Sequence, residues 1–159
     1  MDHPTIFHGY LASDLPESEK ASGRLAGEGQ TVVAAGSITT AHYLKAVTYH
    51  ILANSEVLKT LRAELDKAIP RPHDIPPFKD LESLPYLSAV VKEGFRITHG
   101  IIARLTRVAT AETLQFHDWT IPPGTPVGMS SWLIHNNASL FPDPGKFAPQ
   151  RWLDRKSVV

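Results

Sequence analysis

Hydrophobic residues recur at helical spacing along much of the chain between about residues 20 and 96. From about Lys20 to Ala53 no proline interrupts the pattern, so one long helix is permitted there. The centre of this segment, residues 32–35 (VVAA), is apolar on every side, which predicts a helix that runs through a core rather than over a surface. Asn54 follows and is a suitable N-cap for another helix.

A second helix is predicted from about Ser55 to Ile69, because apolar residues fall on one of its faces. Prolines cluster between residues 70 and 77 and end this helix. The polar residues expected to face outward are Lys59, Arg62, Glu64 and Asp66.

A third helix is expected to begin near Asp80 or Pro85 and to run to about Arg96. Gly100 lies just past its end, where glycine commonly stops a helix. Its predicted buried stripe consists of Leu84, Leu87, Val91 and Phe95.

The hydrophobic period changes after residue 100 and predicts a small β region. Residues 101–109 are rich in β formers, residues 113–116 and 119–121 flank a turn and indicate a hairpin, and residues 127–129 suit another strand. Residues 131–135 fit a brief helix. An ordered loop should follow, because its aromatic residues would seek burial; these are Phe141, Phe147 and Trp152.

These elements predict a mainly α fold with small β sheets, of the α+β class, in one domain. The expected organisation is a lead-in over 1–18, a long central helix over 20–53, two helices with a proline-rich connection over 54–96, a β region over 97–130, and a short helix and loop over 131–159.

The composition excludes several classes of function. Basic and acidic residues number 16 each, so the formal net charge is zero and nothing suggests a nucleic-acid partner. No apolar run approaches the roughly 18 residues that a membrane helix needs. The chain has no cysteine, which excludes disulfides and zinc-thiolate sites and fits an intracellular, reducing compartment.

Small polar residues interrupt the long predicted helix at residues 35–40 (AGSITT). Gly36 has no Cβ and would let a flat ligand approach the backbone. The Thr39 hydroxyl can bond back to the Ala35 carbonyl or donate to something bound in the gap. A contact with a crossing helix explains the same residues, and the segment by itself favours that explanation.

Glu93 and Arg96 lie three residues apart and so share one face of the third predicted helix. If the pair is buried, the carboxylate needs further partners, and Arg151 within residues 147–152 (FAPQRW) could be the second guanidinium. An ExxR spacing is common by chance, so a solvated ion pair is the alternative. Arg107, in the β-rich stretch, could face an anionic ligand or simply be exposed.

The order and spacing of these segments resemble the cytochrome P-450 superfamily of haem-thiolate monooxygenases. Residues 35–40 are similar to the oxygen-activation segment of its long central helix, residues 93–96 (EGFR) to its ExxR signature, and residues 147–152 to its PxRW-type segment. The residues of these motifs are most similar to those of the fungal members of the family that act in natural-product biosynthesis. The resemblance implies a partial cytochrome P-450 fold.

The resemblance also implies roles for individual residues. Ala35, Gly36 and Thr40 would lie at the haem, Thr39 would deliver protons for oxygen activation, and Arg107 would pair with a haem propionate. The structural triad would consist of Glu93, Arg96 and Arg151. The intact family uses haem, a small organic substrate and a redox partner.

Two departures from the family pattern bear on activity. Ile38 stands where the family usually has an acidic residue before the reactive threonine, and an aliphatic side chain cannot relay a proton. The glycine-rich loop with the axial cysteine should follow Trp152 closely, yet the sequence holds no cysteine. The resemblance therefore identifies a C-terminal-half fragment that lacks the axial ligand and any membrane anchor, and that is expected to be inactive alone. The alternative is a non-catalytic module that pairs with another, complementing polypeptide.

Overall fold

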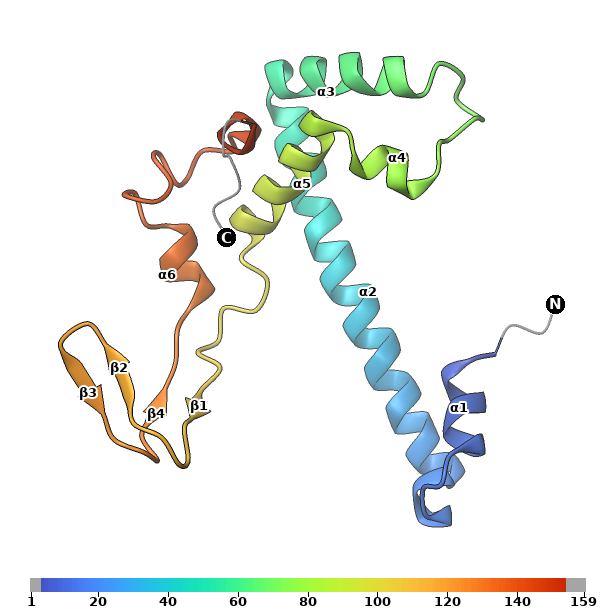
Figure 1. The fold of residues 1–159 in the computed structure, drawn as a ribbon. Coiled ribbons are helices and arrows are strands. Elements are labelled where there is room, and N and C mark those ends of the chain that lie inside the picture. Colours follow the sequence, from blue (N-terminus) through green and yellow to red (C-terminus); the bar gives the residue numbers. More distant parts are fainter. Residues whose placement is uncertain (1–3, 154–159) are drawn as a thin grey trace. The chain divides into compact units, whose positions relative to one another are not determined.

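A computed structural model describes residues 4–153 of the chain. The chain divides into two compact units, Met1–His42 and Tyr43–Val159. The helix α2 (Ser22–Ala53) begins in the first unit and ends in the second (Figure 1). The described residues are mainly helical, with two small antiparallel sheets, which confirms the predicted fold class.

The first unit contains α1 (Ile6–Ala12), the 3-10 turn η1 (Glu17–Lys20) and the first part of α2. The ring of Phe7 lies so close to Gly29 of α2 that a Cβ on this glycine would be 2.8 Å from Phe7 Cζ. The expected lead-in over residues 1–18 thus contains a helix that the sequence pattern did not indicate. A helix of seven residues is too short to show a hydrophobic period.

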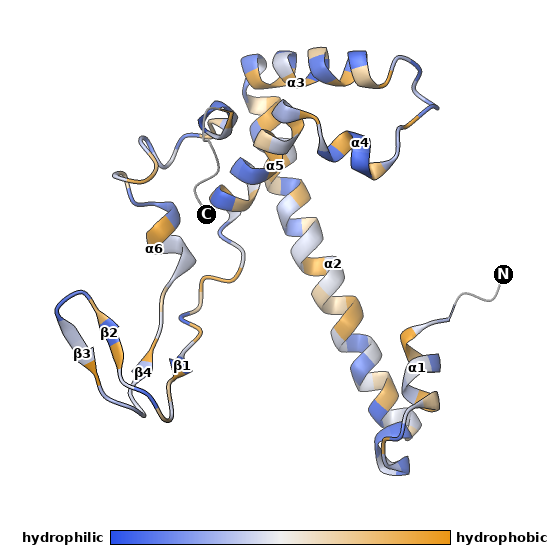
Figure 2. Cartoon of the chain, in the orientation of Figure 1, coloured by the Kyte–Doolittle hydropathy of each residue, from blue (hydrophilic) through white to orange (hydrophobic). Residues whose placement is uncertain are grey.

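The apolar centre of α2 is exposed, so the prediction that it runs through a core is wrong for this chain. Val32 is 50% exposed, Val33 67% and Ile38 69%. Hydrophobic residues recur along much of α2 (Figure 2). Within residues 4–153 their side chains find little apolar cover, and an all-round apolar pattern requires such cover to be buried.

The second unit is built on the last turns of α2 with α3 (Ser55–Ala68), α4 (Phe78–Glu82) and α5 (Pro85–Thr98). The Asn54 side chain accepts a hydrogen bond from the Val57 amide at 3.2 Å and caps α3, as its position predicts. Pro85 begins a new helix rather than continuing α4, because proline suits the first helical turn. The hydrophobic core of this unit consists of Val47, Val57, Leu61, Val90 and Phe147.

The buried face of α5 differs from the predicted stripe. Val91 and Phe95 are exposed, whereas Val90, Glu93 and Arg96 are buried. The prediction assumed that the apolar residues would turn inward. Burial of the charged pair Glu93–Arg96 turns the helix instead, so that Val91 and Phe95 face outward.

The β region is smaller than the sequence indicated. Strand β1 (Arg107–Val108) pairs with β4 (Pro126–Val127), and β2 (Leu114–Phe116) forms the predicted hairpin with β3 (Trp119–Ile121). Helix α6 (Ser131–His135) matches its predicted position, and the 3-10 turn η2 (Pro149–Trp152) ends the described chain. Residues 101–106, which were expected to be β, carry no strand.

Candidate functional site

Glu93 is completely buried in the second unit and accepts five hydrogen bonds. Its Oε1 accepts from Arg96 Nη2 at 2.9 Å, Arg151 Nε at 3.1 Å and the Ala148 amide at 2.8 Å. Its Oε2 accepts from Arg96 Nε at 2.9 Å and from the indole N–H of Trp152 at 2.8 Å. Both oxygens are therefore fully satisfied, which a buried carboxylate requires.

Arg96 is equally buried, at 1% exposure, and uses its whole guanidinium. Two nitrogens hold Glu93 in a bidentate pair, the geometry that suits a planar guanidinium. The remaining N–H groups donate to three backbone carbonyls, those of His135 at 3.0 Å, Pro144 at 2.8 Å and Lys146 at 3.2 Å. Arg96 thus binds α6 and the loop after it to the last turn of α5.

Arg151 completes the group from η2. Besides Glu93, it donates to the Pro142 carbonyl at 3.1 Å and to the Lys146 carbonyl at 3.4 Å. The Lys146 carbonyl therefore accepts from both arginines. The structure brings together the three residues that the sequence proposed as a triad, and their charges surround one carboxylate.

Two partners of Glu93 were missed by the sequence reasoning. The Trp152 indole and the Ala148 backbone both come from the segment that supplies Arg151. The tryptophan directly after Arg151 was a usable signal, since a buried indole N–H usually finds an acceptor. The Ala148 amide left no such signal, because every residue except proline carries a backbone N–H.

The surroundings set the protonation state of Glu93. Burial raises the pKa of this carboxyl, but the hydrogen bonds from Arg96, the Ala148 amide and Trp152 outweigh it. The pKa of Glu93 consequently lies below its ordinary value of 4.5. The group is a stable carboxylate near neutral pH and is unsuited to act as a proton donor there.

Two devices hold α5 in place. The Glu64 carboxylate on α3 accepts from the Tyr86 amide at 2.9 Å and the Leu87 amide at 2.7 Å, so a neighbouring helix caps the start of α5. Glu64 therefore does not face outward as predicted. Gly94 has no Cβ and so allows side chains of α2 to pack closely against α5. A Cβ at this position would clash with Val47 and lie 2.8 Å from the Tyr43 hydroxyl.

The residues proposed to contact haem on α2 lie in the first unit. Ala35, Gly36, Thr39 and Thr40 are helical and are not buried. The Thr39 hydroxyl donates to the Ala35 carbonyl at 2.7 Å, the bond anticipated from the sequence. A Cβ added at Gly36 would meet nothing within 4 Å, so the helix backbone is accessible there.

Arg107 lies on β1 in the second unit and is exposed. Its Nη1 donates to the neighbouring Thr106 carbonyl at 3.3 Å, a local contact that leaves further donors of the guanidinium available. Arg107 does not share in the Glu93 cluster.

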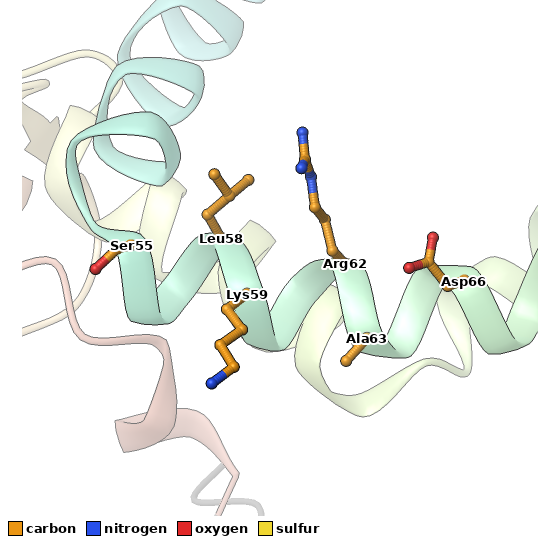
Figure 3. Close-up of a pocket in the computed structure, with 6 residues that line it drawn as sticks. All are labelled: Ser55, Leu58, Lys59, Arg62, Ala63 and Asp66. Atoms are coloured by element: carbon orange, nitrogen blue, oxygen red, sulfur yellow. The ribbon is translucent and has the colours of Figure 1, made fainter.

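An open hollow lies along α3, lined by Ser55, Leu58, Lys59, Arg62, Ala63 and Asp66. Leu58 and Arg62 extend to one side of the helix and Lys59 to the other (Figure 3). The residues do not converge on a common point, so the hollow lacks the arrangement of a catalytic site.

Within residues 4–153, no three histidine, aspartate or glutamate side chains gather in a way that could hold a metal ion. None of the helices in that range combines the length and the apolar character that a membrane crossing requires.

Comparison with known proteins gives a consistent result. Residues 13–158 match the family model described as Cytochrome P450. The chain is 44% identical to the cytochrome P450 monooxygenase MO6277 of Ascocoryne sarcoides, covering 94% of this chain and 29% of that protein. It is 46% identical to the N-acetyltryptophan 6-hydroxylase ivoC of Emericella nidulans, covering 96% of this chain and 30% of that protein.

A solved structure of similar fold is a zebra fish cytochrome P450 with progesterone. It has a TM-score of 0.64 and 29% sequence identity, over 78% of this chain and 29% of that one. The chain spans about 30% of the length of the curated relatives it matches. The chain belongs to the cytochrome P450 family.

Proposed function

We propose that this chain of 159 residues is part of a haem-dependent monooxygenase. In that enzyme Glu93, Arg96 and Arg151 would stabilise the core on the haem side. The observation that supports this proposal best is the burial of Glu93 with five hydrogen-bond donors. Such a network fixes α5, α6 and η2 together, and a rigid support is what a cofactor pocket needs. The named relatives are monooxygenases or hydroxylases, which agrees with this role.

The proposed reaction is the oxidation of a small organic substrate by dioxygen, with electrons from a redox partner, in the biosynthesis of fungal natural products. Haem supplies the oxygen chemistry when it is bound. When haem is bound, the exposed backbone at Gly36 would suit the face of the porphyrin, with Ala35 and Thr40 beside it, and Arg107 would pair with a propionate. The Thr39 hydroxyl holds a proton for delivery, although its bond to Ala35 would have to exchange.

The donor set of these 159 residues does not fit a complete haem-thiolate site. The sequence has no cysteine, and a thiolate is the iron ligand of this enzyme class. Gly36 and Arg107 suit a porphyrin and its propionate, but they cannot ligate iron in that way. The 159 residues by themselves are therefore proposed to be inactive.

A second candidate, pairing with another polypeptide, is supported by exposed apolar side chains on α2. Leu44, Tyr49 and Leu52 in the second unit are 55–66% exposed. Apolar surface of this kind favours association. In this alternative a complementing polypeptide covers the helix, and the chain itself has a binding rather than a catalytic role.

A chimera separates these possibilities. This chain would replace the matching segment of the Ascocoryne sarcoides relative, which is 44% identical. After reduction under carbon monoxide, the chimera is expected to show the red-shifted Soret band of thiolate-ligated haem, and the 159-residue chain is expected to show none. Loss of the band in the chimera, with the fold retained, would contradict the monooxygenase role. A band from the chain alone would contradict its inactivity.

A further inference from the structure

Helix α6 is held against the end of α5 by polar contacts that gather around His99. His99 ends α5 in the left-handed conformation, with φ of 58°. Its ring stacks on that of His135, the last residue of α6, with centroids 5.9 Å apart. The Ser131 hydroxyl donates to the His99 carbonyl at 3.0 Å. These contacts join two elements whose orientation matters to the Glu93 cluster, because Arg96 binds the His135 carbonyl.

Asn136 determines which nitrogen of His99 carries the proton. Its Nδ2 donates to the Trp132 carbonyl at 2.9 Å, and a carbonyl can only accept, so the amide nitrogen must point this way. The same Nδ2 lies 3.4 Å from His99 Nε2. Nε2 must then be the acceptor, and neutral His99 carries its proton on Nδ1.

A second proton on His99 would convert this contact into a repulsion. Nε2–H would face the N–H of Asn136, and the amide could not turn over without losing the Trp132 carbonyl. The Nδ1 atoms of His99 and His135 are both buried and have no hydrogen-bond partner. The charged ring would therefore lose one bond and gain no side-chain acceptor in return.

The positive charges that face the two rings disfavour protonation of both histidines. The ionisable groups around them are Arg96 on α5 and, for each ring, the other histidine. Burial lowers the pKa of His99, and the positive charges of His135 and Arg96 lower it further, against a smaller opposing effect of the Arg96 backbone. Burial and Arg96 likewise lower the pKa of His135. The stabilising contact is complete above the ordinary value of 6.5 and is lost as the pH falls through the lower pKa of His99 in the folded chain.

We propose that His99 and Asn136 form a proton-sensitive latch, which holds α6 on the end of α5 while His99 is neutral and releases α6 when His99 is protonated. Release would remove the His135 carbonyl from Arg96 and loosen the loop over residues 136–146. The latch is independent of haem and of the proposed reaction, since it uses only side chains of this chain.

Hydrogen exchange of the full chain tests the latch. Protection factors of the α6 amides, corrected for the intrinsic pH dependence of exchange, are compared at pH 7.5 and at an acid pH at which NMR shows the His99 ring to be protonated. In the unmodified chain they should fall at acid pH by roughly fivefold or more, the change expected from the loss of one hydrogen bond. In His99→Gln they should not fall, because the glutamine oxygen accepts from Asn136 at every pH. His73→Gln, at an exposed histidine, is the matched control and should behave like the unmodified chain.

Asn136→Asp provides a test with the opposite sign. The carboxylate of the substituted residue would accept from protonated His99, so acid pH should protect α6 instead of exposing it. An α6 whose protection stays unchanged in the original chain after His99 is protonated would overturn the proposal. So would an acid loss of protection that persists in both His99→Gln and Asn136→Asp.

Discussion

The indole N–H of Trp152 donates a hydrogen bond to the carboxylate of Glu93 at 2.8 Å, across 59 positions of sequence. This bond places the turn η2 directly on the buried face of α5. Together with Arg151 and the Ala148 amide, it explains how one short segment supplies three of the five donors to a buried charge. The cluster is therefore a network of four side chains and a backbone amide, and the arginine pair is only part of it.

Replacing Trp152 with phenylalanine keeps an aromatic side chain and removes the indole N–H donor. We expect Trp152→Phe to lower the free energy of unfolding by about 1.5–3 kcal/mol, because a hydrogen bond to a buried charged group is lost. Trp119→Phe is the control, since Trp119 is 72% exposed on the hairpin, and should change stability by less than about 0.5 kcal/mol. Urea unfolding of the two variants measures the difference, and equal effects would contradict the assigned bond.

Glycine substitutions on two helices should have opposite effects. Gly94→Ala should destabilise the chain by about 1–3 kcal/mol, because the new methyl group would collide with Val47 and Tyr43. Gly36→Ala should stabilise it by up to about 1 kcal/mol, because open space surrounds that position and alanine favours helix. Denaturation midpoints that shift in the same direction for both variants would argue against the crossing of α2 and α5.

Replacing one carboxylate oxygen of Glu64 should weaken the cap that α3 provides for α5. Glu64→Gln leaves a single oxygen for the Tyr86 and Leu87 amides, so one amide would face an NH₂ group. The expected loss of stability is about 1–2 kcal/mol. Asp66→Asn, at an exposed position on the same helix, should cost little, and hydrogen exchange of the first turn of α5 should distinguish the two variants.

Acid should destabilise the second unit through Glu93. Its pKa in the folded chain lies below 4.5, so the stabilisation from its charge is complete above that ordinary value and is lost as the pH falls through the folded value. Carbon-13 NMR of the side-chain carboxyl should show the pKa of Glu93 below the ordinary glutamate value of 4.5. A titration midpoint at or above that value would contradict the network of donors.

Local patterns predicted where the helices lie in the sequence better than which of their residues are buried. Proline, the Asn54 cap and the hydrophobic period placed α3, α5 and α6 within a few residues. The inward turn of Glu93 and the outward turn of Phe95 depend on partners that arrive from residues 148–152, which no local pattern specifies. The half-buried position of Glu64 was missed for the same reason, because its acceptor role depends on a second helix.

The candidate site was likewise only partly predictable from local sequence. The spacing of Glu93 and Arg96 places them on one helix face, so their contact could be expected from sequence. The convergence of Arg151 could be expected only from the resemblance to a family, since spacing alone favoured a solvated ion pair. The proposed roles of Thr39 and Arg107 at haem remain predictions from that resemblance.

A double-mutant cycle between Glu93 and Arg151 tests the central claim most directly, namely that these residues meet in a buried network. The free energy of unfolding would be measured by urea for Glu93→Gln, Arg151→Met and the double variant. Direct contact at 3.1 Å predicts a coupling energy above about 1 kcal/mol. Effects that add within about 0.5 kcal/mol would show that the two groups do not interact and would contradict the account.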